Sequence, residues 1–496
     1  MILVSENIKK NLKVSITVLF LLLQVSFFAQ SAKKVSVIGN YKNWKWDSVF
    51  VAKNKYISLA VVPKAGGRIL EYNLGEIASL WVNPEMLGKS FMSSDEVKKE
   101  EWRNFGGYRI VPIPISNCAV GVGGEKIKRW PPPAILGDSP YSAKISNENG
   151  EDFIEVASGI QKLPVPSFDF KSQSFVYPEK IDEELQYKRR LRIEENSSLV
   201  YIEHMIFNRG NEAVKRGIMS SSQHISRSNP ELTDGKNFCV YIPFDKKYRL
   251  PNGDQYEITG TAETRWQFVN RNRKSLDKNN PEHVKLYYNN GTNWTGEVAP
   301  GVFEIHYDYD LMSGFHMISS DSWVSYVNKL NNTAFVKILE PYNSKLEYED
   351  GTNLSIYNSA LSSGYLETEV RTPIYSINPG AYASYTEIHA AAKIASVPVL
   401  SVNRSGIITR KMNFNGATKR LSGQFGVFFE GVAVLQLLDG SEKKVKEIVL
   451  EDVNPLKAFL FDIKLNNSSE VANVLLQIKD RNNNYHLLDS AVVVNK

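Results

Sequence analysis

The fold class is decided by three consecutive runs of sequence: LQYKRRLRI (185–193), LVYIEHMIFN (199–208) and AVKRGIM (213–219). Turn-forming residues separate the runs, which is typical of short β-strands joined in a meander. Similar runs occupy residues 56–62, 302–309, 323–330 and 333–339. One segment favours a helix, residues 97–102, because Ser93 and Glu96 before it have the spacing of a capping box. The chain is therefore predicted to be all-β.

The composition changes near residue 395, which indicates a second domain. All eight Trp lie between Trp44 and Trp323, and Tyr485 is the only Tyr after Ser396. The later part contains a predicted hairpin, in which a turn at 439–440 joins residues 431–438 to residues 445–450. Further strands are predicted at 458–465, 471–478 and 485–494. We expect a large domain at 32–395 and a small C-terminal β-sandwich at 396–496.

The composition excludes several classes of protein. Of the 496 residues, 42% are hydrophobic and 23% are charged, so the chain is neither disordered nor fibrous. The net charge of +5 is too small over this length to indicate nucleic acid as a partner. Cys118 and Cys239 are the only cysteines, which excludes a disulfide framework. They either pair with each other or stay unpaired and buried, and the unpaired state is favoured.

The first 31 residues have the order of a secretory signal. Lys9, Lys10 and Lys13 precede an uncharged stretch with an apolar centre at 16–25, and small residues follow at 29–32. The alternative is a single membrane anchor, but the apolar run is short for a span and contains polar residues. We predict a signal peptide at 1–31 that is removed, leaving a protein without a membrane span that is exported to the periplasm or secreted.

Two glycine pairs are each followed by an arginine. VPKAGGRI (62–69) contains Arg68, and WRNFGGYRIVPIP (102–114) contains Arg109, with WPPP beginning at Trp130. Aromatic faces and guanidinium groups together suit carbohydrate, because sugar rings pack their C–H faces on aromatic rings and their hydroxyls need polar partners. The alternatives are a solvated arginine at a strand turn and aromatic packing over a sheet edge.

Carboxylates and an imidazole lie on two other predicted strands. RGIMSSSQH (216–224) ends at His224, and GYLETE (364–369) contains Glu367 and Glu369. The two glutamates are two positions apart, so they share one face of a strand. Such a pair faces a polar cavity, a cation or simply solvent. The P-loop, H-E-x-x-H and G-x-S-x-G motifs are absent from the sequence.

Together these segments resemble the galactose-mutarotase-like superfamily over roughly residues 50–390. The run VPKAGGRI is similar to the start of aldose 1-epimerase domains. The NFGGYR and WPPP segments look more like a branch of that superfamily known only as a domain of unknown function. The resemblance implies a β-supersandwich fold, which also hosts lyases and purely sugar-binding domains.

The resemblance also implies roles for the candidate residues. In mutarotases a Glu base at the anomeric hydroxyl works with a His acid at the ring oxygen. Leu366 and Glu367 match the start of the family's Leu-Glu-x-Gln segment, whereas Glu369 replaces its Gln, and His224 holds only the approximate place of the acid. The catalytic pair would be Glu367 and His224. Substrate would be bound by Arg68, Arg109, Trp130 and Glu369, without a cofactor or metal.

We therefore expect an exported carbohydrate-binding protein, with aldose-epimerase-type chemistry as a hypothesis for the same site. The alternative is a non-catalytic sugar-binding protein or an accessory to polysaccharide degradation. Geometry discriminates between these hypotheses. Epimerase chemistry by this pair requires Glu367 and His224 to flank one cleft, and it fails if they point to opposite faces of a sheet.

Overall fold

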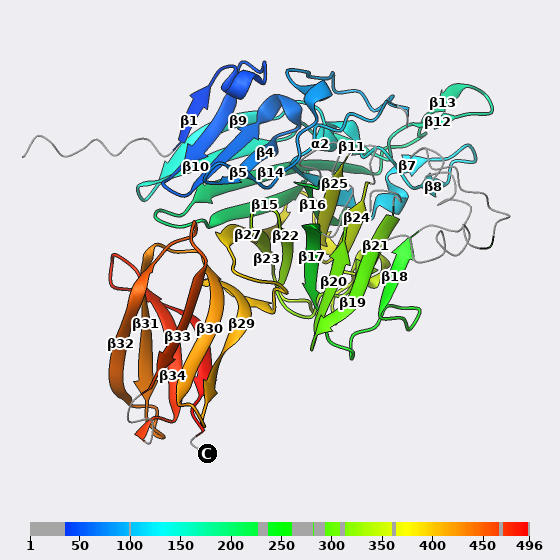
Figure 1. Cartoon of the computed structure of the whole chain (residues 1–496). Helices are drawn as coiled ribbons and strands as arrows, with labels where there is room; N and C mark the ends of the chain where they lie inside the picture. The colour runs from blue at the N-terminus through cyan, green and yellow to red at the C-terminus, as the bar shows by residue number, and fades with distance from the viewer. Residues whose placement is uncertain are drawn as a thin grey trace, which may run out of the picture.

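The computed structural model describes residues 35–98, 101–226, 237–259, 281, 293–307, 313–359, 364–465 and 470–494. The predicted signal peptide lies outside these residues. The described chain consists mainly of antiparallel strands, arranged in two large sheets followed by two small ones (Figure 1). The prediction of an all-β chain, with a β-supersandwich before a small β-sandwich, is confirmed. Within the described ranges, no helix has the length and apolar character needed to cross a membrane.

The first large sheet has twelve strands in the described part of the chain. In spatial order its main path is β1 (Val35–Ile38), β2 (Val49–Lys53), β3 (Ile57–Val62), β4 (Arg68–Leu74), β6 (Tyr108–Ile113), β16 (Val214–Ile225), β25 (Tyr365–Arg371), β24 (Leu354–Asn358), β21 (Ser313–Met317) and β18 (Tyr256–Thr259). β5 (Ile77–Ala78) pairs with β4, and β26 (Tyr375–Ile377) pairs with β16.

The second large sheet has eleven described strands. In spatial order its main path is β19 (Asn293–Ala299), β20 (Val302–His306), β17 (Phe238–Pro243), β22 (Trp323–Asn328), β23 (Thr333–Ile338), β27 (Tyr382–Lys393), β15 (Val200–Asn208), β14 (Glu183–Ile193), β10 (Glu151–Ala157) and β9 (Ser142–Glu148). β11 (Gln161–Leu163) pairs with β14. Two short hairpins, β7 (Ala119–Val120) with β8 (Lys126–Ile127) and β12 (Ser167–Asp169) with β13 (Ser174–Val176), and the short helix α2 (Ala134–Gly137) decorate the loops.

The two large sheets face each other across one hydrophobic core. Leu59 and Leu366 of the first sheet belong to the same buried cluster as Val240 and Phe335 of the second. Burial of such apolar side chains contributes roughly 1.5–3 kcal/mol for each large residue. In the middle of the first sheet, every residue of β6 and residues 216–224 of β16 are buried. Both faces of these strands are therefore covered, and the side away from the core is where the candidate site lies.

The predicted meander is correct for two of its three strands. β14 and β15 pair as neighbouring antiparallel strands. β16 instead crosses to the first sheet, where it pairs with β6 and β25, because β27 occupies the free edge of β15. This crossing brings the run that contains His224 beside the run that contains Glu367.

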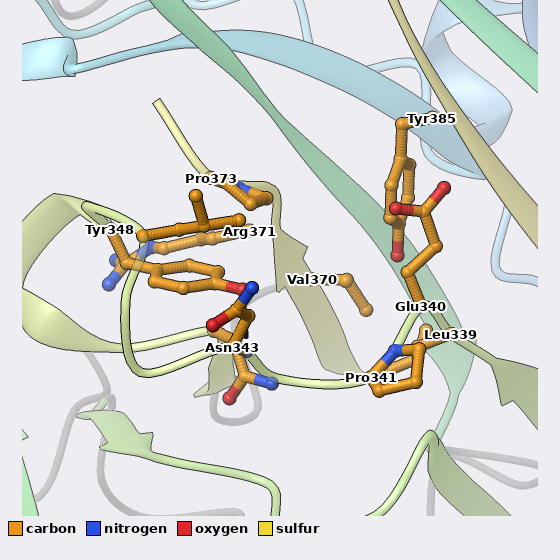
Figure 2. A pocket seen from close by; sticks show the side chains of 11 residues that line it. Leu339, Glu340, Pro341, Asn343, Tyr348, Val370, Arg371, Pro373 and Tyr385 are labelled. Atoms are coloured by element: carbon orange, nitrogen blue, oxygen red, sulfur yellow. Dashed lines mark hydrogen bonds between the residues drawn. The ribbon is translucent and has the colours of Figure 1, made fainter. Parts of the chain in front are cut away.

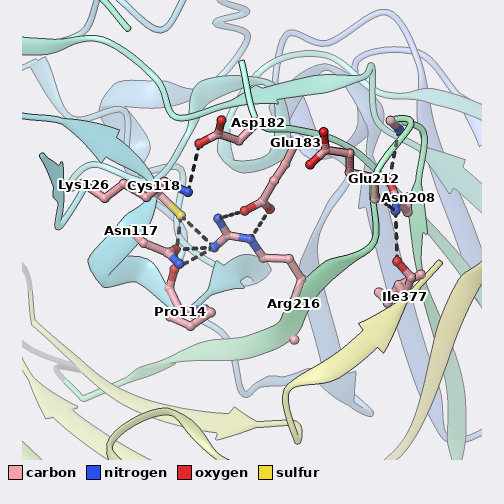
Figure 3. A network of polar contacts seen from close by, with 12 residues as sticks. Pro114, Asn117, Cys118, Lys126, Asp182, Glu183, Asn208, Glu212, Arg216 and Ile377 are labelled. Carbon is pink, nitrogen blue, oxygen red and sulfur yellow. Dashed lines mark hydrogen bonds and ion pairs between the residues drawn. The ribbon is translucent and has the colours of Figure 1, made fainter. Parts of the chain in front are cut away.

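An ion pair ties β16 back to the second sheet (Figure 3). The Arg216 guanidinium donates to both carboxylate oxygens of Glu183, at 2.5 and 3.0 Å, and to Oδ1 of Asn117 at 2.7 Å. Its Nη1 also lies 3.5 Å from Sγ of Cys118. Cys118 and Cys239 are both buried and are not joined in a disulfide, as favoured from the sequence, and burial raises the pKa of each thiol to about 11.

The C-terminal part is a sandwich of two four-stranded sheets. One sheet contains β28 (Ser401–Val402), β29 (Gly406–Asn415), β30 (Arg420–Val427) and β33 (Phe459–Lys464), and the other contains β32 (Lys444–Val453), β31 (Gly431–Leu438), β34 (Asn473–Lys479) and β35 (Tyr485–Val492). The predicted hairpin is β31 paired with β32. The C-terminal sandwich contacts the large sheets through a buried cluster that includes Leu199 and Ile388 on one side and Ile407 and Phe428 on the other.

The α-helix predicted for residues 97–102 does not form at its start, although Glu101 lies in a 3₁₀ turn, in which its amide donates to the Lys98 carbonyl oxygen at 3.0 Å. Residues 95–98 are not helical. The Asp95 carboxylate is engaged elsewhere, because it accepts hydrogen bonds from the Ala134 amide at 2.7 Å and from Nε2 of Gln161 at 2.7 Å. These long-range bonds hold the segment in an irregular path and fasten it to the loop that follows Trp130.

Candidate functional site

A cluster of polar side chains lies on the outer face of three adjacent strands. Arg109 on β6 is paired in register with Ser221 on β16, and Ser221 is paired with Glu369 on β25. Gln223 and Glu367 form the next row on the same face. Paired residues of antiparallel strands point to the same side of a sheet, so these side chains converge. We call these five residues, together with Trp102 and Trp130 above them, the Arg109 cluster.

Glu367 is the acceptor at the centre of this cluster. Its carboxylate is 3% exposed, and Oε1 accepts hydrogen bonds from Oγ of Ser221 and, at 3.4 Å, from Nε2 of Gln223. Nη2 of Arg109 lies 3.8 Å from the same oxygen. This carboxylate oxygen therefore lies between two hydrogen-bond donors and a guanidinium group. Glu367 is thus suited to accept a proton or a hydroxyl hydrogen bond.

Arg109 is buried without the hydrogen bonds that a buried arginine normally makes. It is 2% exposed, yet none of its three guanidinium nitrogens has a hydrogen-bond partner among the described residues. The guanidinium carbon lies 5.4 Å from the ring centre of Trp102 and 5.0 Å from that of Trp130. The two indoles are 5.4 Å apart, tilted by 57°, and only partly buried. They therefore stand between Arg109 and solvent.

The glycine pair before Arg109 explains its position. Gly106 and Gly107 have φ angles of 86° and 68°, a region that residues with a Cβ rarely adopt. A Cβ on Gly107 would lie 2.3 Å from the carbonyl oxygen of Ile69, and one on Gly106 would lie 2.4 Å from that of Trp81. The pair thus lets β6 approach its neighbours closely, and Arg109 then projects from the outer face.

Two carboxyl groups near Arg109 have raised pKa values. Burial and the negative charge of Glu367 raise the pKa of Glu369 to about 7. Nearby, burial raises the pKa of Asp138, whose carboxylate lies 3.8 Å from Arg103, to about 6. Glu369 is therefore substantially protonated at neutral pH. A carboxyl group that keeps its proton at neutral pH can act as a proton donor.

His224 does not share this face. Nε2 of His224 lies 2.9 Å from Oγ1 of Thr368, the neighbour of Glu367 on β25. Successive residues of a strand point to opposite faces, so His224 faces the core while Glu367 faces outward. The imidazole is fully buried and stacks on Tyr326 of the second sheet, with ring centres 4.4 Å apart. The expectation that His224 acts as the acid opposite Glu367 in one cleft does not fit this geometry.

Arg68 is adjacent to the cluster but is directed to the backbone. Its guanidinium donates to the carbonyl oxygens of Gly106 at 3.1 Å and Gly137 at 3.3 Å. Burial, followed by the positive charge of Arg109, lowers the pKa of Arg68 to about 9. These bonds fasten β4 to the segments on either side of the Trp-Pro-Pro-Pro run. Of the predicted site residues, the structure brings together Glu367, Glu369, Arg109 and Trp130, and it places Arg68 behind them as a support.

Sequence reasoning missed Ser221, Gln223 and Trp102 as members of the site. Ser221 and Gln223 occupy alternate positions in the same run as His224, so the period of a strand would have offered them as the alternative to His224. The sequence of one strand alone does not show whether Ser221 and Gln223 or His224 lie on the face of the sheet that carries the site. Trp102 begins the segment that carries Arg109, and only the fold shows that it meets Trp130.

The comparisons with known proteins concern the fold. No protein-family model and no curated protein sequence matches the chain. Among solved structures, a galactose mutarotase-like protein from Clostridium acetobutylicum is similar over 73% of this chain and 98% of its own, with 12% identity and a TM-score of 0.41. The Slr1438 protein from Synechocystis sp. PCC 6803 is similar over 69% and 95%, with 13% identity and a TM-score of 0.40. A galactose mutarotase-like protein from Lactobacillus casei matches over 69% and 99%, with 7% identity and a TM-score of 0.38. Two of these three descriptions name the superfamily that the sequence motifs resemble.

Proposed function

We propose that this chain is an exported carbohydrate-binding protein whose ligand contacts the Arg109 cluster. The observation that supports this most directly is the Arg109 guanidinium, which is buried beside two indole rings without a hydrogen bond from the described residues. Leaving a buried donor unpaired costs roughly 1–3 kcal/mol. A ligand that supplies acceptor oxygens to Arg109 would recover that free energy.

Carbohydrate fits this cluster better than other small ligands do. Sugar C–H faces pack on indoles such as those of Trp102 and Trp130. Sugar hydroxyls can accept from Arg109 and donate to Glu367, and a sugar carboxylate would match the planar guanidinium. Because the indoles cover Arg109, ligand entry requires them to move aside. Export is proposed from the order of basic, apolar and small residues at 1–31.

The binding proposal is tested by thermal shift and calorimetry with a panel of neutral and acidic mono- and oligosaccharides. A ligand that binds only the folded protein raises its melting temperature. We expect at least one sugar to raise the melting temperature of the wild type and to have no effect on Arg109→Met. Arg420→Met is the matched control, because Arg420 is exposed in the C-terminal sandwich, where it pairs with Asp462. Absence of a shift with every sugar would contradict the proposal.

A second candidate function is epimerase-type proton transfer at the same cluster. It is favoured by the position of Glu367 and Glu369 on one strand face and by the different environments of the two carboxyl groups. Glu367 would act as the base and Glu369, rather than His224, as the acid. The test follows anomer exchange of a bound sugar by NMR in wild type, Glu367→Gln and Glu369→Gln. If both variants lose anomer exchange but still bind the sugar, catalysis is supported. If the wild type exchanges anomers only at the uncatalysed rate, the epimerase function is contradicted and only the binding function remains.

A further inference from the structure

A separate cavity is lined by the loop that follows β23 and by residues of β25 and β27 (Figure 2). It has a volume of about 220 Å³, and none of its lining residues belongs to the Arg109 cluster. Figure 2 shows Arg371, Tyr348 and Asn343 on one side of it and Glu340 and Tyr385 on the other. Because this volume is below the roughly 300–1,000 Å³ of pockets for drug-sized ligands, it suits a single small ring rather than an extended chain.

The walls of the cavity are fixed by hydrogen bonds within the protein. The hydroxyl of Tyr348 accepts from the Asn343 amide at 3.2 Å, and the Glu340 carboxylate accepts from the Thr386 amide at 3.1 Å. Nη1 of Arg371 donates to Oγ1 of Thr352 at 2.5 Å. Side chains that are already positioned lose little conformational entropy when a ligand binds. The cavity is therefore built before any ligand arrives.

Its chemistry is balanced between donors, acceptors and apolar faces. Arg371 is 7% exposed, and its Nε has no hydrogen-bond partner among the described residues. On the opposite wall, Glu340 supplies carboxylate oxygens. Asn343 and Asn353 add two amide side chains, and apolar and aromatic groups complete the lining: Leu339, Pro341, Leu346, Tyr348, Val370, Pro373 and Tyr385. One cationic and one anionic side chain leave the lining close to neutral, so neither an anion nor a cation is favoured as a ligand.

We propose that this cavity is a second ligand site, which takes one neutral, monosaccharide-sized polyol ring. Hydroxyl oxygens of the ring accept from Nε of Arg371, other hydroxyls donate to Glu340, and the C–H face packs on Tyr348. This proposal stands independently of the proposed function, because it uses none of the residues of the Arg109 cluster.

The experiment titrates the purified protein with methyl α-D-glucopyranoside and methyl β-D-galactopyranoside, followed by saturation-transfer NMR and calorimetry. Both probes are neutral rings whose anomeric oxygen is blocked, so neither can be interconverted at the Arg109 cluster. The variants are Glu340→Gln, which removes the charged acceptor, and Asn343→Trp, which fills the space from an exposed loop position. Glu347→Gln is the matched control, since Glu347 is exposed in the same loop and is not in the lining.

We expect at least one glycoside to bind the wild type, with about tenfold weaker binding to Glu340→Gln, as expected for losing a hydrogen bond to a charged group. Asn343→Trp should abolish binding, while Glu347→Gln and Arg109→Met should leave it unchanged. Binding that is lost in Arg109→Met but kept in both cavity variants would overturn the second site and leave the proposed function standing. If both cavity variants bind the glycosides more weakly, and Arg109→Met changes the binding of no sugar, the second site is supported and the proposed function is contradicted. Absence of glycoside binding to the wild type would overturn the second site.

Discussion

At the scale of single residues, Arg109 is the side chain whose state most needs an explanation. Taking a charge out of water is costly unless it is paired and hydrogen-bonded. Here the nearest carboxylate oxygen is 3.8 Å away, and the remaining neighbours include two indole faces. Glu367, by contrast, already accepts from Ser221 and Gln223. The arrangement leaves the donors of Arg109, rather than the oxygens of Glu367, as the groups most in need of a ligand.

Arg109→Lys separates the charge of Arg109 from its shape. Lysine keeps the positive charge but lacks the planar fork that binds two oxygens at once and stacks on indoles. We expect the affinity for the bound sugar to fall at least about tenfold, the amount that corresponds to about 1.4 kcal/mol. Calorimetry on wild type, Arg109→Lys and Arg420→Lys measures it. Equal affinity in all three proteins would show that only charge, or a different site, matters.

The raised pKa of Glu369 predicts how the rate of anomer exchange depends on pH. Its pKa is raised to about 7 by burial and by Glu367, so the protonated acid is present below that pH and lost above it. If Glu369 donates the proton, the exchange rate falls as the pH rises from 6 through 8. Rates measured by NMR across this range in Glu369→Gln should be low and lack this fall. An unchanged profile in Glu369→Gln would assign the titration to another group.

At the scale of elements, β16 shows how far sequence reasoning reaches. Its existence and approximate ends follow from the run of residues, because turn-forming residues precede it. Its sheet does not follow, since pairing with β6 and β25 joins segments that are more than a hundred residues apart in the chain. The face of each side chain depends on that pairing. Gln223 and His224 are consecutive residues, yet Gln223 contacts Glu367 on the outer face and His224 packs in the core. A pairing register that differed by one residue would exchange these two faces.

β27 and β16 are joined beneath the site by a buried polar network. The Glu387 carboxylate is fully buried and accepts hydrogen bonds from Ser220, from Tyr108 at 3.1 Å and from His389 at 2.9 Å. Lys337 donates to the carbonyl oxygen of Thr368 at 2.9 Å, directly after Glu367 in the chain. The network thus holds from the core side the strands that present the Arg109 cluster on the outer side.

Glu387→Leu should therefore destabilise the large domain by about 3–5 kcal/mol, because three buried donors lose their acceptor and the buried Lys337 cation loses a nearby negative charge. Glu203→Leu, on the adjacent strand β15 but 43% exposed, should change stability by no more than about 0.5 kcal/mol. Urea unfolding followed by Trp fluorescence measures both, since all eight Trp lie before residue 324 and report on the large domain. Similar small effects of the two substitutions would show that the network contributes little.

At the scale of the whole molecule, the two parts of the chain are joined by more than a linker. Oγ of Ser197 and the amide of Ser198 donate to the carbonyl oxygen of Phe428, at 2.8 and 2.9 Å, and the Phe428 ring lies in the buried cluster that both parts share. The change of composition near residue 395 predicted two parts, but it carried no information about this contact. An interface between parts depends on pairs of residues such as Ser197 and Phe428 that are remote in sequence.

Acid should destabilise the folded molecule below about pH 6.5, where the histidines of an unfolded chain become protonated. Burial lowers the pKa of His204 and His316 to about 3, that of His224 well below its usual range and that of His389 also below it. In the unfolded chain these groups titrate near about 6.5, so below that pH the unfolded state binds more protons, and each group costs up to about 1.4 kcal/mol per pH unit. Glu369 and Asp138, whose pKa values are raised to about 7 and about 6, act in the opposite direction, as do Asp95, Glu349 and Asp489, whose pKa values burial also raises, and these groups reduce the size of the effect. Urea unfolding at pH 7.5, 6.0 and 5.0 should therefore give a stability that declines with acidification. His204→Asn should flatten the decline by removing one titrating group. A stability that is constant or rises down to pH 5.0 would contradict neutral, buried histidines in the folded state.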